Sequence, residues 1–278
     1  MPFSLTNAPA TFQSYIDDCL QPYIDDFTLC YLDDILIYST NAKEHEEYIR
    51  KVLELLRVLG LYCKAEKCQF RVSKIVFLGF VIDSEGIGME WDRTSTIEDW
   101  PMLKSIRDVQ VLLGLTNFYR RFIRKYTKVA APITHLLQRR SGSSRWEWTR
   151  DAKLAFRKLK RVFTKVPIIQ HLNPRKLIIL QNDASGFAIG GILSQYDGFG
   201  TLRPVNFYSR KCSSAKQIYN TYDQELLAIV ETIKQWRHYL EGADHKILIQ
   251  CDHKNLECFQ ISKVLSRRQA QWAEVLSS

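Results

Sequence analysis

The chain has 278 residues, of which 46% are hydrophobic and 25% are charged, and its formal net charge is +9. This composition supports packed cores and excludes a disordered chain, a collagen or a coiled coil, and no apolar run approaches the ~20 residues that a membrane span needs. The N-terminus lacks the pattern of a signal peptide, and seven scattered cysteines without a Cys-x-x-Cys pair argue against a disulfide framework or a zinc site, so we expect an intracellular protein of the cytoplasm, the nucleus or both.

Apolar periodicity, β-prone runs and cap residues predict the elements of residues 1–165. The predicted elements are, in chain order, a helix over 9–23 with Asn7 as its N-cap, a hairpin over 27–39, an amphipathic helix over 43–59 closed by Gly60, short strands over 68–89 with a turn at 83–86, two or three short helices over 106–138, and a helix over 150–165 capped by Thr149. A run of Arg, Ser and Gly at 139–144 is typical of a linker, and we expect a domain boundary within 139–170.

The pattern changes after Pro167, where short apolar strands come first and helices follow. Strands are predicted over 176–183, 187–195, 203–210 and 246–252, and helices over 215–240 and 267–276. Strands followed by an alternation of helix and strand indicate a layered sheet with flanking helices. The sequence therefore predicts an α/β (α+β) protein.

The charge is distributed unevenly along the chain. Residues 1–100 hold 9 basic and 17 acidic side chains, whereas residues 103–165 hold 17 basic and 3 acidic ones, and residues 166–278 hold 13 and 10. The basic middle alternates cations with aromatic rings, namely Arg120, Arg121, Arg124, Lys125 and Lys128 with Phe118, Tyr119, Phe122 and Tyr126. Because such a surface releases counterions from a polyanion and its rings can stack on bases, it predicts a nucleic-acid surface. For any single residue, a solvated helix face with its rings in the core is the alternative.

Two adjacent carboxylates, Asp33 and Asp34, lie between two apolar strand arms. Successive side chains of a strand point to opposite faces, so both acids can face one cation only at a tight turn. Two carboxylates that close repel each other, and a divalent cation relieves the repulsion. A polar hairpin turn without a metal is the alternative, since Asp is common in turns.

Three further acids lie at the ends of predicted elements. Asp183 ends an apolar strand and precedes the small residues of 184–186, Glu225 lies on the long helix, and Asp252 ends a second apolar strand. Acids at two strand ends can meet a helix acid that packs across the sheet, and three such carboxylates suit a pair of Mg²⁺ ions. The alternative is that these are turn or capping aspartates and an exposed helix glutamate.

Several motifs resemble the reverse transcriptases of gypsy-type long-terminal-repeat retrotransposons. They occur in the same order as in that family, over essentially the whole chain: MPFSLTNAPATFQ at 1–13, YLDDILIYS at 31–39, FLGF at 77–80, LGLTNFYRRFI at 113–123 and APIT at 131–134. The resemblance continues in the ribonuclease H (RNase H) domain that follows the polymerase in such elements, through DAS at 183–185, GGILSQ at 190–195, the helix segment 222–230 and DHKNL at 252–256. Asn182 departs from the pattern, in which Thr or Val is commoner at that position.

The resemblance implies three parts. Residues 1–90 would be a partial polymerase palm with a hairpin like the primer grip, 91–165 the basic helices of the thumb and connection, and 166–278 an RNase H-like domain truncated at its C-terminus. It implies that Asp33 and Asp34 are the palm's metal ligands, and that Asp183, Glu225 and Asp252 are the metal ligands of an RNA-strand hydrolase, with Mg²⁺ or alternatively Mn²⁺. The residues expected to contact nucleic acid are Asn7, Gln13, Phe77, Leu78, Gly79, Arg120, Arg121, Arg124 and Lys125.

The expected function is RNA-directed DNA polymerase and RNase H activity on a primer–template or an RNA–DNA hybrid. In the family, a further palm carboxylate lies upstream of the first motif and a fourth RNase H acid lies beyond the last one, so we expect the activity of this chain to be weak or absent. A nucleic-acid-binding remnant without catalysis, or a non-catalytic subunit beside a full-length polymerase chain, are the alternatives. The sequence shows no Asp-Thr-Gly motif and no zinc-binding His/Cys cluster, which argues against a protease or an integrase.

Overall fold

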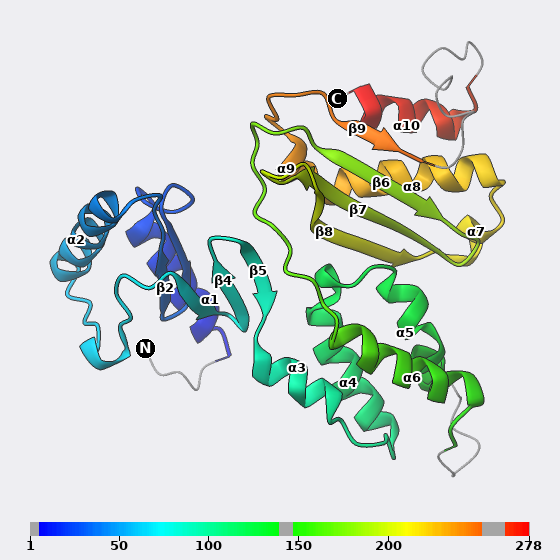
Figure 1. The fold of residues 1–278 in the computed structure, drawn as a ribbon, viewed down its shortest axis with the longest axis horizontal. Coiled ribbons are helices and arrows are strands. Elements are labelled where there is room, and N and C mark those ends of the chain that lie inside the picture. The colour runs from blue at the N-terminus through cyan, green and yellow to red at the C-terminus, as the bar shows by residue number, and fades with distance from the viewer. Residues whose placement is uncertain (1–5, 139–146, 252–264, 278) are drawn as a thin grey trace. The chain divides into compact units, whose positions relative to one another are not determined.

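The computed structural model describes residues 6–138, 147–251 and 265–277. The chain forms two compact units, Met1–Ser84 and Glu85–Ser278, and Figure 1 labels their helices and strands. Both units combine helices with β-strands, which confirms the predicted α/β (α+β) class. The division into three parts stays a prediction, and the predicted break at 139–144 lies outside the described residues. In the described parts of the chain, no helix is both long and apolar enough to cross a membrane.

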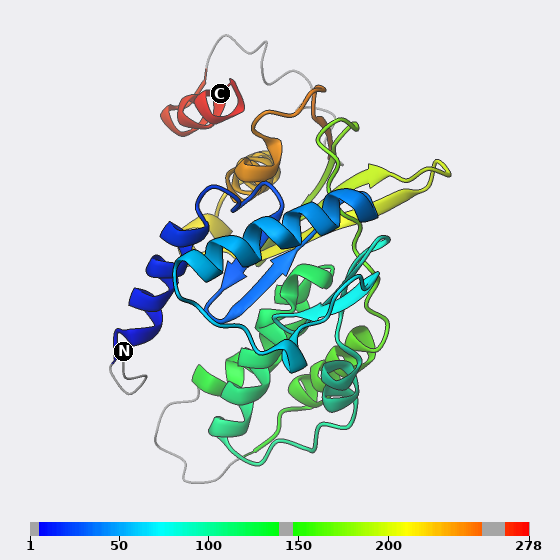
Figure 2. The ribbon, with the colours of Figure 1, turned by 90° about the vertical axis from the view of Figure 1, so that its left-hand side faces the viewer.

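The first unit packs two helices against a β-hairpin. Its elements are α1 (Ala8–Leu20), β1 (Thr28–Tyr31), β2 (Asp34–Ile37), α2 (Ala42–Val58), the short 3-10 helix η1 (Ala65–Lys67), β3 (Lys74–Phe77) and β4 (Phe80–Asp83). β1 and β2 are antiparallel, and α2 lies along this hairpin (Figure 2). The core between them buries apolar side chains from both helices and from the turn before β1: Ile16, Leu20, Phe27, Val52 and Leu56.

Three details of this unit differ from the prediction. Helix α1 ends at Leu20, and the backbone N–H groups of Tyr23 and Ile24 both donate to the Leu20 carbonyl in the turn that follows. The Asn7 side chain makes no capping hydrogen bond to α1. The strand segment begins only at Lys74, six residues later than predicted. The hairpin over 27–39 and the amphipathic helix over 43–59 are confirmed.

The turn between β1 and β2 depends on a side chain from α1. Tyr31 pairs with Asp34, which leaves Leu32 and Asp33 as a two-residue turn. Leu32 has a φ of 53°, a left-handed conformation that is costly for a residue with a bulky side chain. The side-chain carbonyl of Gln13 accepts a hydrogen bond from the Leu32 N–H at 2.7 Å. This bond holds the turn in a conformation that leucine does not favour.

Replacing Gln13 by alanine is expected to loosen this turn, because the Leu32 N–H loses its acceptor. We expect the first unit to lose about 1 kcal/mol of unfolding free energy and residues 28–37 to exchange their amide hydrogens faster, as measured by mass spectrometry. Ser14→Ala, an exposed position on the same helix, is the control and should leave the exchange unchanged. Wild-type exchange rates in Gln13→Ala would show that the turn does not depend on this hydrogen bond.

The second unit begins with one strand and a group of short helices. Its elements up to residue 163 are β5 (Gly86–Met89), α3 (Trp91–Glu98), α4 (Ile106–Phe118), η2 (Arg120–Phe122), α5 (Tyr126–Thr134), η3 (His135–Gln138) and α6 (Arg150–Phe163). The predicted Thr149 cap of α6 is confirmed, since its side chain accepts from the Ala152 N–H at 3.1 Å. Ser105 and Asp108 form a capping box at the start of α4, which satisfies backbone N–H groups that the helix leaves open.

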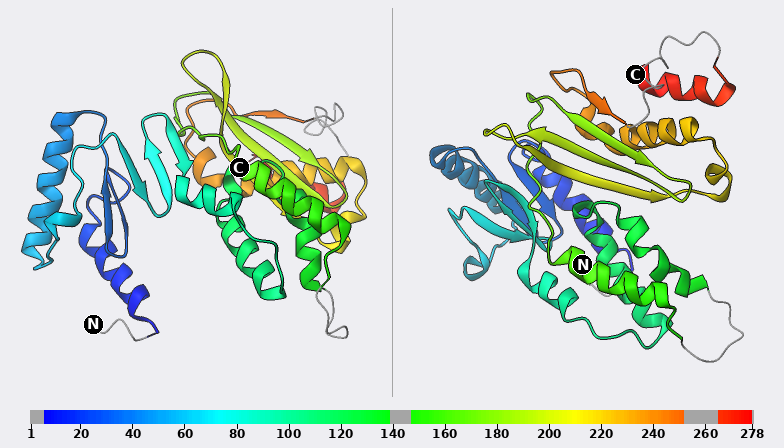
Figure 3. Two further views of the ribbon diagram at one scale, coloured as in Figure 1. Left: turned by 60° about the horizontal axis from the view of Figure 1, so that its bottom comes forward. Right: turned by 45° about the vertical axis from the view of Figure 1, so that its right-hand side comes forward.

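A four-stranded sheet follows these helices, in the order β8-β7-β6-β9. Its strands and the helices around it are β6 (Ile179–Ala184), β7 (Ala188–Tyr196), β8 (Leu202–Lys211), α7 (Ser214–Gln217), α8 (Thr221–Gln235), α9 (Arg237–Leu240), β9 (Leu248–Gln250) and α10 (Arg267–Ser277). β6, β7 and β8 are antiparallel neighbours, whereas β9 runs parallel to β6. Helix α8 covers one face of the sheet, and η2 and α5 contact β8 on the other face (Figure 3).

The strands over 176–183, 187–195 and 203–210 are confirmed within a few residues, and the one at 246–252 is shorter, with its last residue outside the described part. The prediction of one helix over 215–240 is wrong, because this segment forms α7, α8 and α9. Helix α8 starts afresh at Asn220, whose side chain accepts from the Asp223 N–H at 2.7 Å. The apolar pattern alone predicts one continuous helix, but the polar N-cap Asn220 begins a new helix within it.

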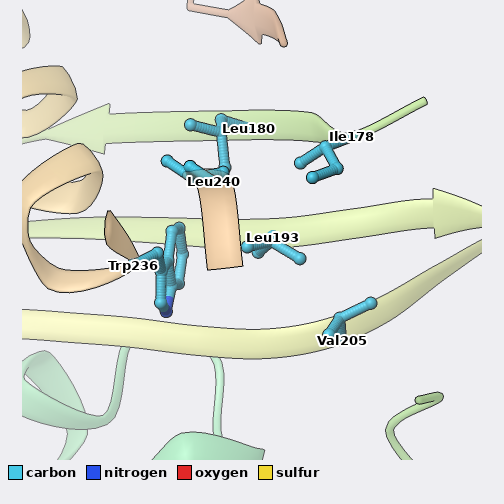
Figure 4. Packing of buried hydrophobic residues seen from close by; sticks show 6 residues of the cluster. All are labelled: Ile178, Leu180, Leu193, Val205, Trp236 and Leu240. Atoms are coloured by element: carbon cyan, nitrogen blue, oxygen red, sulfur yellow. The ribbon is translucent and has the colours of Figure 1, made fainter. Parts of the chain in front are cut away.

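Trp236, at the end of α8, fills the core between this helix and the sheet. Its ring and five aliphatic side chains around it form the cluster drawn in Figure 4: Ile178, Leu180, Leu193, Val205 and Leu240. One polar pair lies beside this core, where the Thr232 hydroxyl donates to the Asn182 side-chain carbonyl at 2.7 Å. A Cβ on Gly191 would lie 2.4 Å from the Thr232 methyl carbon and 3.2 Å from the Trp236 ring. The helix therefore approaches β7 closely only because residue 191 lacks a side chain.

Gly191→Ala is expected to destabilise the second unit by about 1–3 kcal/mol, because the added methyl group overpacks the contact between α8 and β7. Urea denaturation followed by tryptophan fluorescence measures the loss. The adjacent Gly190→Ala is the matched control: its Cβ would meet the Tyr208 carbonyl oxygen at 3.4 Å, so we expect a change below about 0.5 kcal/mol. Equal stability of the two variants would contradict the proposed close packing at residue 191.

Candidate functional site

The acidic pair of the first unit lies at the tip of the β1–β2 hairpin, as predicted. Asp33 is in the turn and Asp34 opens β2, and both are exposed. The pKa of the nearby Cys30 thiol is raised to about 11, mainly by burial, with a further contribution from the negative charges of Asp17, Asp34 and Asp33. Three carboxylates therefore lie near this tip, and a divalent cation would relieve the repulsion between them.

Gln13 and Asn7 were expected to contact nucleic acid. In the structure, the Gln13 side chain makes hydrogen bonds within the protein. Its carbonyl accepts from the Leu32 N–H, and its amide donates to Asp17 at 2.7 Å and to the Cys30 carbonyl at 3.4 Å. Asn7 lies exposed just before α1. Gln13 thus links the helix to the hairpin and to one of its acids, so it positions the carboxylate tip whether or not it also touches a ligand.

The segment Phe77-Leu78-Gly79 forms the tip of the β3–β4 hairpin. Phe77 pairs with Phe80, and the two turn residues, Leu78 and Gly79, both have positive φ values, 52° and 78°. A two-residue turn with two left-handed residues matches the right-handed twist of the strands it joins. Leu78 is an exposed apolar side chain at this tip. The predicted hairpin is present, and its contact with a primer stays a prediction.

Asp183 lies near the end of β6 in the second unit, and two lysines of α5 and its N-terminus contact it. Lys125 Nζ lies 2.8 Å and Lys128 Nζ 3.5 Å from the same Oδ2 atom. Burial by itself raises the pKa of Asp183, but the hydrogen bond from Lys125 and the charges of Lys128 and Lys125 outweigh it and hold that pKa below its usual value. The carboxylate is therefore ionised at neutral pH, as a metal ligand must be.

Glu225 comes from the first half of α8 and is buried. Ala228, one turn further along α8, belongs to a buried cluster against which Ala184 packs, and Ala184 is the last residue of β6. The part of α8 that carries Glu225 is therefore near this end of β6. Asp252, the third predicted ligand, lies outside the described residues. Within the parts of the chain that the structure describes, no three His, Cys, Asp or Glu side chains come close enough to hold a metal ion.

A hollow of about 240 Å³ opens beside Asp183. Its walls come from the basic segment before α5 and from the strands β6, β7, β8 and β9: Arg124, Lys125, Gln181, Asn182, Asp183, Gly190, Gly191, Ile192, Tyr208, Gln250 and Cys251. The hollow thus joins the carboxylate of Asp183, two of the predicted nucleic-acid cations and Cys251, the residue directly before Asp252. Among the described residues that line the hollow, Asp183 is the carboxylate, and carboxylate oxygens are the donors that a hard divalent cation prefers.

Some side chains of the basic block pack or bond within the protein, whereas others are exposed. Tyr119, Phe122 and Tyr126 are buried in the core, so the alternative interpretation holds for these rings, whereas Phe118 is exposed. The Arg120 guanidinium donates to the backbone carbonyl of Ser209 on β8 and lies over the Tyr126 ring. Its position ties η2 to the sheet, a role that its charge alone did not suggest.

The sequence placed Lys128 in the basic block without linking it to Asp183, and it did not single out Asp223. Lys125 precedes α5 in a left-handed conformation and Lys128 lies in the first turn of α5, so their approach to one carboxylate depends on tertiary structure and left no local signal. Asp223 is buried at the start of α8 and accepts from the Gln269 amide of α10 at 2.9 Å. Asn182, the departure from the expected motif, is explained by its bond to Thr232.

Comparisons with known families agree with this geometry. Residues 1–82 match the family described as "Reverse transcriptase (RNA-dependent DNA polymerase)", and residues 173–278 match the "RNase H-like domain found in reverse transcriptase". The Transposon Tf2-3 and Tf2-7 polyproteins of Schizosaccharomyces pombe are each 33% identical over 274 residues, or 98% of this chain. The chain spans 20% of the length of these relatives.

Among solved structures, the foamy viral protease-reverse transcriptase is similar in fold. Its dRH form in complex with double-stranded DNA has a TM-score of 0.81, and its complex with an RNA/DNA hybrid has a TM-score of 0.78, both at 20% identity. Each match covers 100% of this chain, and 48% and 38% of the viral chains respectively. Reverse transcriptases and their RNase H domains depend in general on divalent metal ions. The chain thus contains a reverse transcriptase segment and an RNase H-like domain, and over 98% of its length it is homologous to transposon Tf2 polyproteins.

Proposed function

We propose that this chain takes part in reverse transcription, with two acidic centres. Asp33 and Asp34 are the carboxylates of a polymerase palm, and Asp183, Glu225 and Asp252 form an RNase H-type centre that cuts the RNA strand of an RNA–DNA hybrid. The family matches support these roles, and the activities of the much longer relatives are carried over to this chain as part of the proposal.

The observation that carries the RNase H proposal is the surroundings of Asp183. An ionised carboxylate stands near a strand end, beside a hollow whose other walls include Arg124 and Lys125. The strand beside β6, which is β9, leads directly to Asp252, and α8 presents Glu225 at the same end of β6. β6 and α8 thus carry Asp183 and Glu225 at the same end of the sheet, and Arg124 and Lys125 line the hollow beside Asp183.

Mg²⁺ is the proposed ion, with Mn²⁺ as the alternative. The proposed ligands are carboxylates, and both ions prefer oxygen donors. When bound, a pair of such ions activates water and stabilises the leaving oxygen of the cut strand. The protein's own contribution is to keep Asp183 ionised, through the charges of Lys125 and Lys128, and to position Glu225 through the packing of α8 on β6.

The proposed partner is an RNA–DNA hybrid or a primer–template duplex, and a full-length polymerase chain is a further proposed partner. Arg124 and Lys125 line the hollow beside Asp183, where the phosphates of a cut strand would lie. Cations at such a place neutralise phosphates and fix the position of a duplex without reading its sequence. Recognition of the RNA strand would then depend on its 2′-hydroxyl groups.

A nucleic-acid-binding protein without catalysis is the second candidate function, favoured by the positive charge of residues 103–165. The two candidates differ in their dependence on metal. A nuclease requires a divalent cation for cleavage, whereas a binding protein shows a steep dependence of affinity on salt and none on the metal.

Asp183→Asn tests the nuclease proposal. We expect at most weak cleavage of the RNA strand of a hybrid in Mg²⁺ or Mn²⁺, and cleavage by the variant to be slower still by roughly 100-fold or more, because a metal ligand is lost. Asp197→Asn is the matched control: Asp197 lies in the loop after β7, where it accepts from the Phe199 and Thr201 N–H groups. Products that are equal for wild type and Asp183→Asn, or that form equally in EDTA, would contradict the nuclease and leave the binding function.

Arg124→Gln tests the proposed duplex contact. We expect the logarithm of the affinity for a hybrid to fall with the logarithm of the salt concentration, and the slope to decrease in magnitude by about 1 in the variant, since one phosphate contact is lost. Arg50→Gln on α2, an exposed arginine of the acidic part of the chain, is the charge control. Fluorescence anisotropy in EDTA measures the slopes. Identical slopes for Arg124→Gln and wild type would contradict the contact.

A further inference from the structure

The two lysines that contact Asp183 bring it a charge equal to that of a divalent cation. Both ammonium groups approach one oxygen, Oδ2, with Lys125 at 2.8 Å and Lys128 at 3.5 Å. Their side chains are 39% and 37% exposed, so they remain in contact with solvent. A cation that used this oxygen as a ligand would lie close to both ammonium groups. Like charges at such distances repel, so the two lysines disfavour cation binding.

The backbone around α5 fixes this arrangement. Asp183, Gly190 and Ser209 lie side by side on β6, β7 and β8, in one row across the sheet. The Ser209 hydroxyl accepts from the Thr127 N–H at 3.0 Å, and its backbone carbonyl accepts from Arg120. The N-terminal end of α5 is therefore attached to the same row of the sheet that carries the carboxylate.

Two local features direct Lys125 toward Asp183. Lys125 has a φ of 56°, a left-handed conformation that lysine rarely adopts and that the surrounding contacts must maintain. Gly190, between Asp183 and Ser209, has no side chain and lines the same hollow as Lys125. A strained backbone at the lysine and an open position on β7 are the features expected of a contact that has a function rather than of a mobile surface pair.

We propose that Lys125 and Lys128 hold Asp183 as internal counterions in the free protein, and that a bound polynucleotide releases the carboxylate for a divalent cation by drawing both ammonium groups to its phosphates. This inference rests on the proposed RNase H-type centre. Phosphates are the competing anions, because lysines neutralise them with release of counterions. Since coupling between two ligands is reciprocal, the polynucleotide tightens cation binding and the cation tightens polynucleotide binding by the same factor.

The affinity of the full chain for Mn²⁺, measured without nucleic acid from the electron paramagnetic resonance signal of free Mn²⁺, tests the first half of the inference without any catalysis. We expect the double variant Lys125→Gln/Lys128→Gln to bind Mn²⁺ about tenfold more tightly than wild type, a typical coupling between two sites. Lys153→Gln/Lys158→Gln, two exposed lysines of α6, removes the same charge and is the control. The control should bind Mn²⁺ as wild type does, and equal tightening in both double variants would overturn the inference.

A third variant separates this inference from the proposed centre on which it rests. Asp183→Asn added to Lys125→Gln/Lys128→Gln should abolish the gain in Mn²⁺ affinity. If the triple variant binds Mn²⁺ as tightly as the double variant, Asp183 is no metal ligand and the proposed centre fails. If the double variant binds as wild type does while Asp183→Asn alone weakens binding, the centre stands and the counterion role of the lysines is overturned.

Binding of a double-stranded DNA, which an RNA-strand nuclease does not cut, tests the second half. We expect Mn²⁺ to tighten the wild-type complex by about tenfold in fluorescence anisotropy at fixed salt. In Lys125→Gln/Lys128→Gln we expect weaker binding of the DNA and little further effect of Mn²⁺. Equal tightening by Mn²⁺ in wild type and in this variant would overturn the coupling through the two lysines.

Discussion

The packing of α8 on one face of the β8-β7-β6-β9 sheet is the constraint on which the second unit depends. Trp236 and Thr232 come within contact distance of β7 because Gly191 has no side chain, and Asn182 turns inward to bond Thr232. Successive side chains of a strand alternate between faces. Once Asn182 faces the helix, Asp183 must face the opposite side, where η2 and α5 contact the sheet. The buried contact thereby determines which side of the sheet carries the acid.

The same sheet joins the two kinds of charge that the sequence keeps apart. Basic residues are concentrated in 103–165, whereas Asp183 lies in the part of the chain that follows. Arg120 and Thr127 bond to Ser209, and this attachment brings Lys125 to Asp183 across β7. Part of the positive charge is thus used inside the protein. The surface that remains for a polynucleotide is smaller than the composition suggests, and it is located beside an acid instead of on an isolated helix.

Much of the fold could be predicted, because hairpins, amphipathic helices and strands leave local patterns. The hairpin that carries Asp33 and the Thr149 cap follow from neighbouring residues alone. The break between α7 and α8 was missed, since Asn220 interrupts an otherwise apolar period. Contacts between distant residues left no local signal: the bond of Gln13 to Leu32 and the ion pairs of Asp183 depend on tertiary packing, as does the burial of three of the four rings in the basic block.

The two-residue turn between β1 and β2 also limits how this hairpin can change in evolution. Inserting or deleting one residue in either arm would exchange the inward and outward faces of that arm, so apolar residues such as Ile35 and Ile37 would move to solvent. It would also move the Leu32 N–H away from Gln13, which is fixed on a separate helix. Length changes are therefore expected to accumulate in other loops of the lineage, while the spacing from Thr28 to residue 37 stays constant.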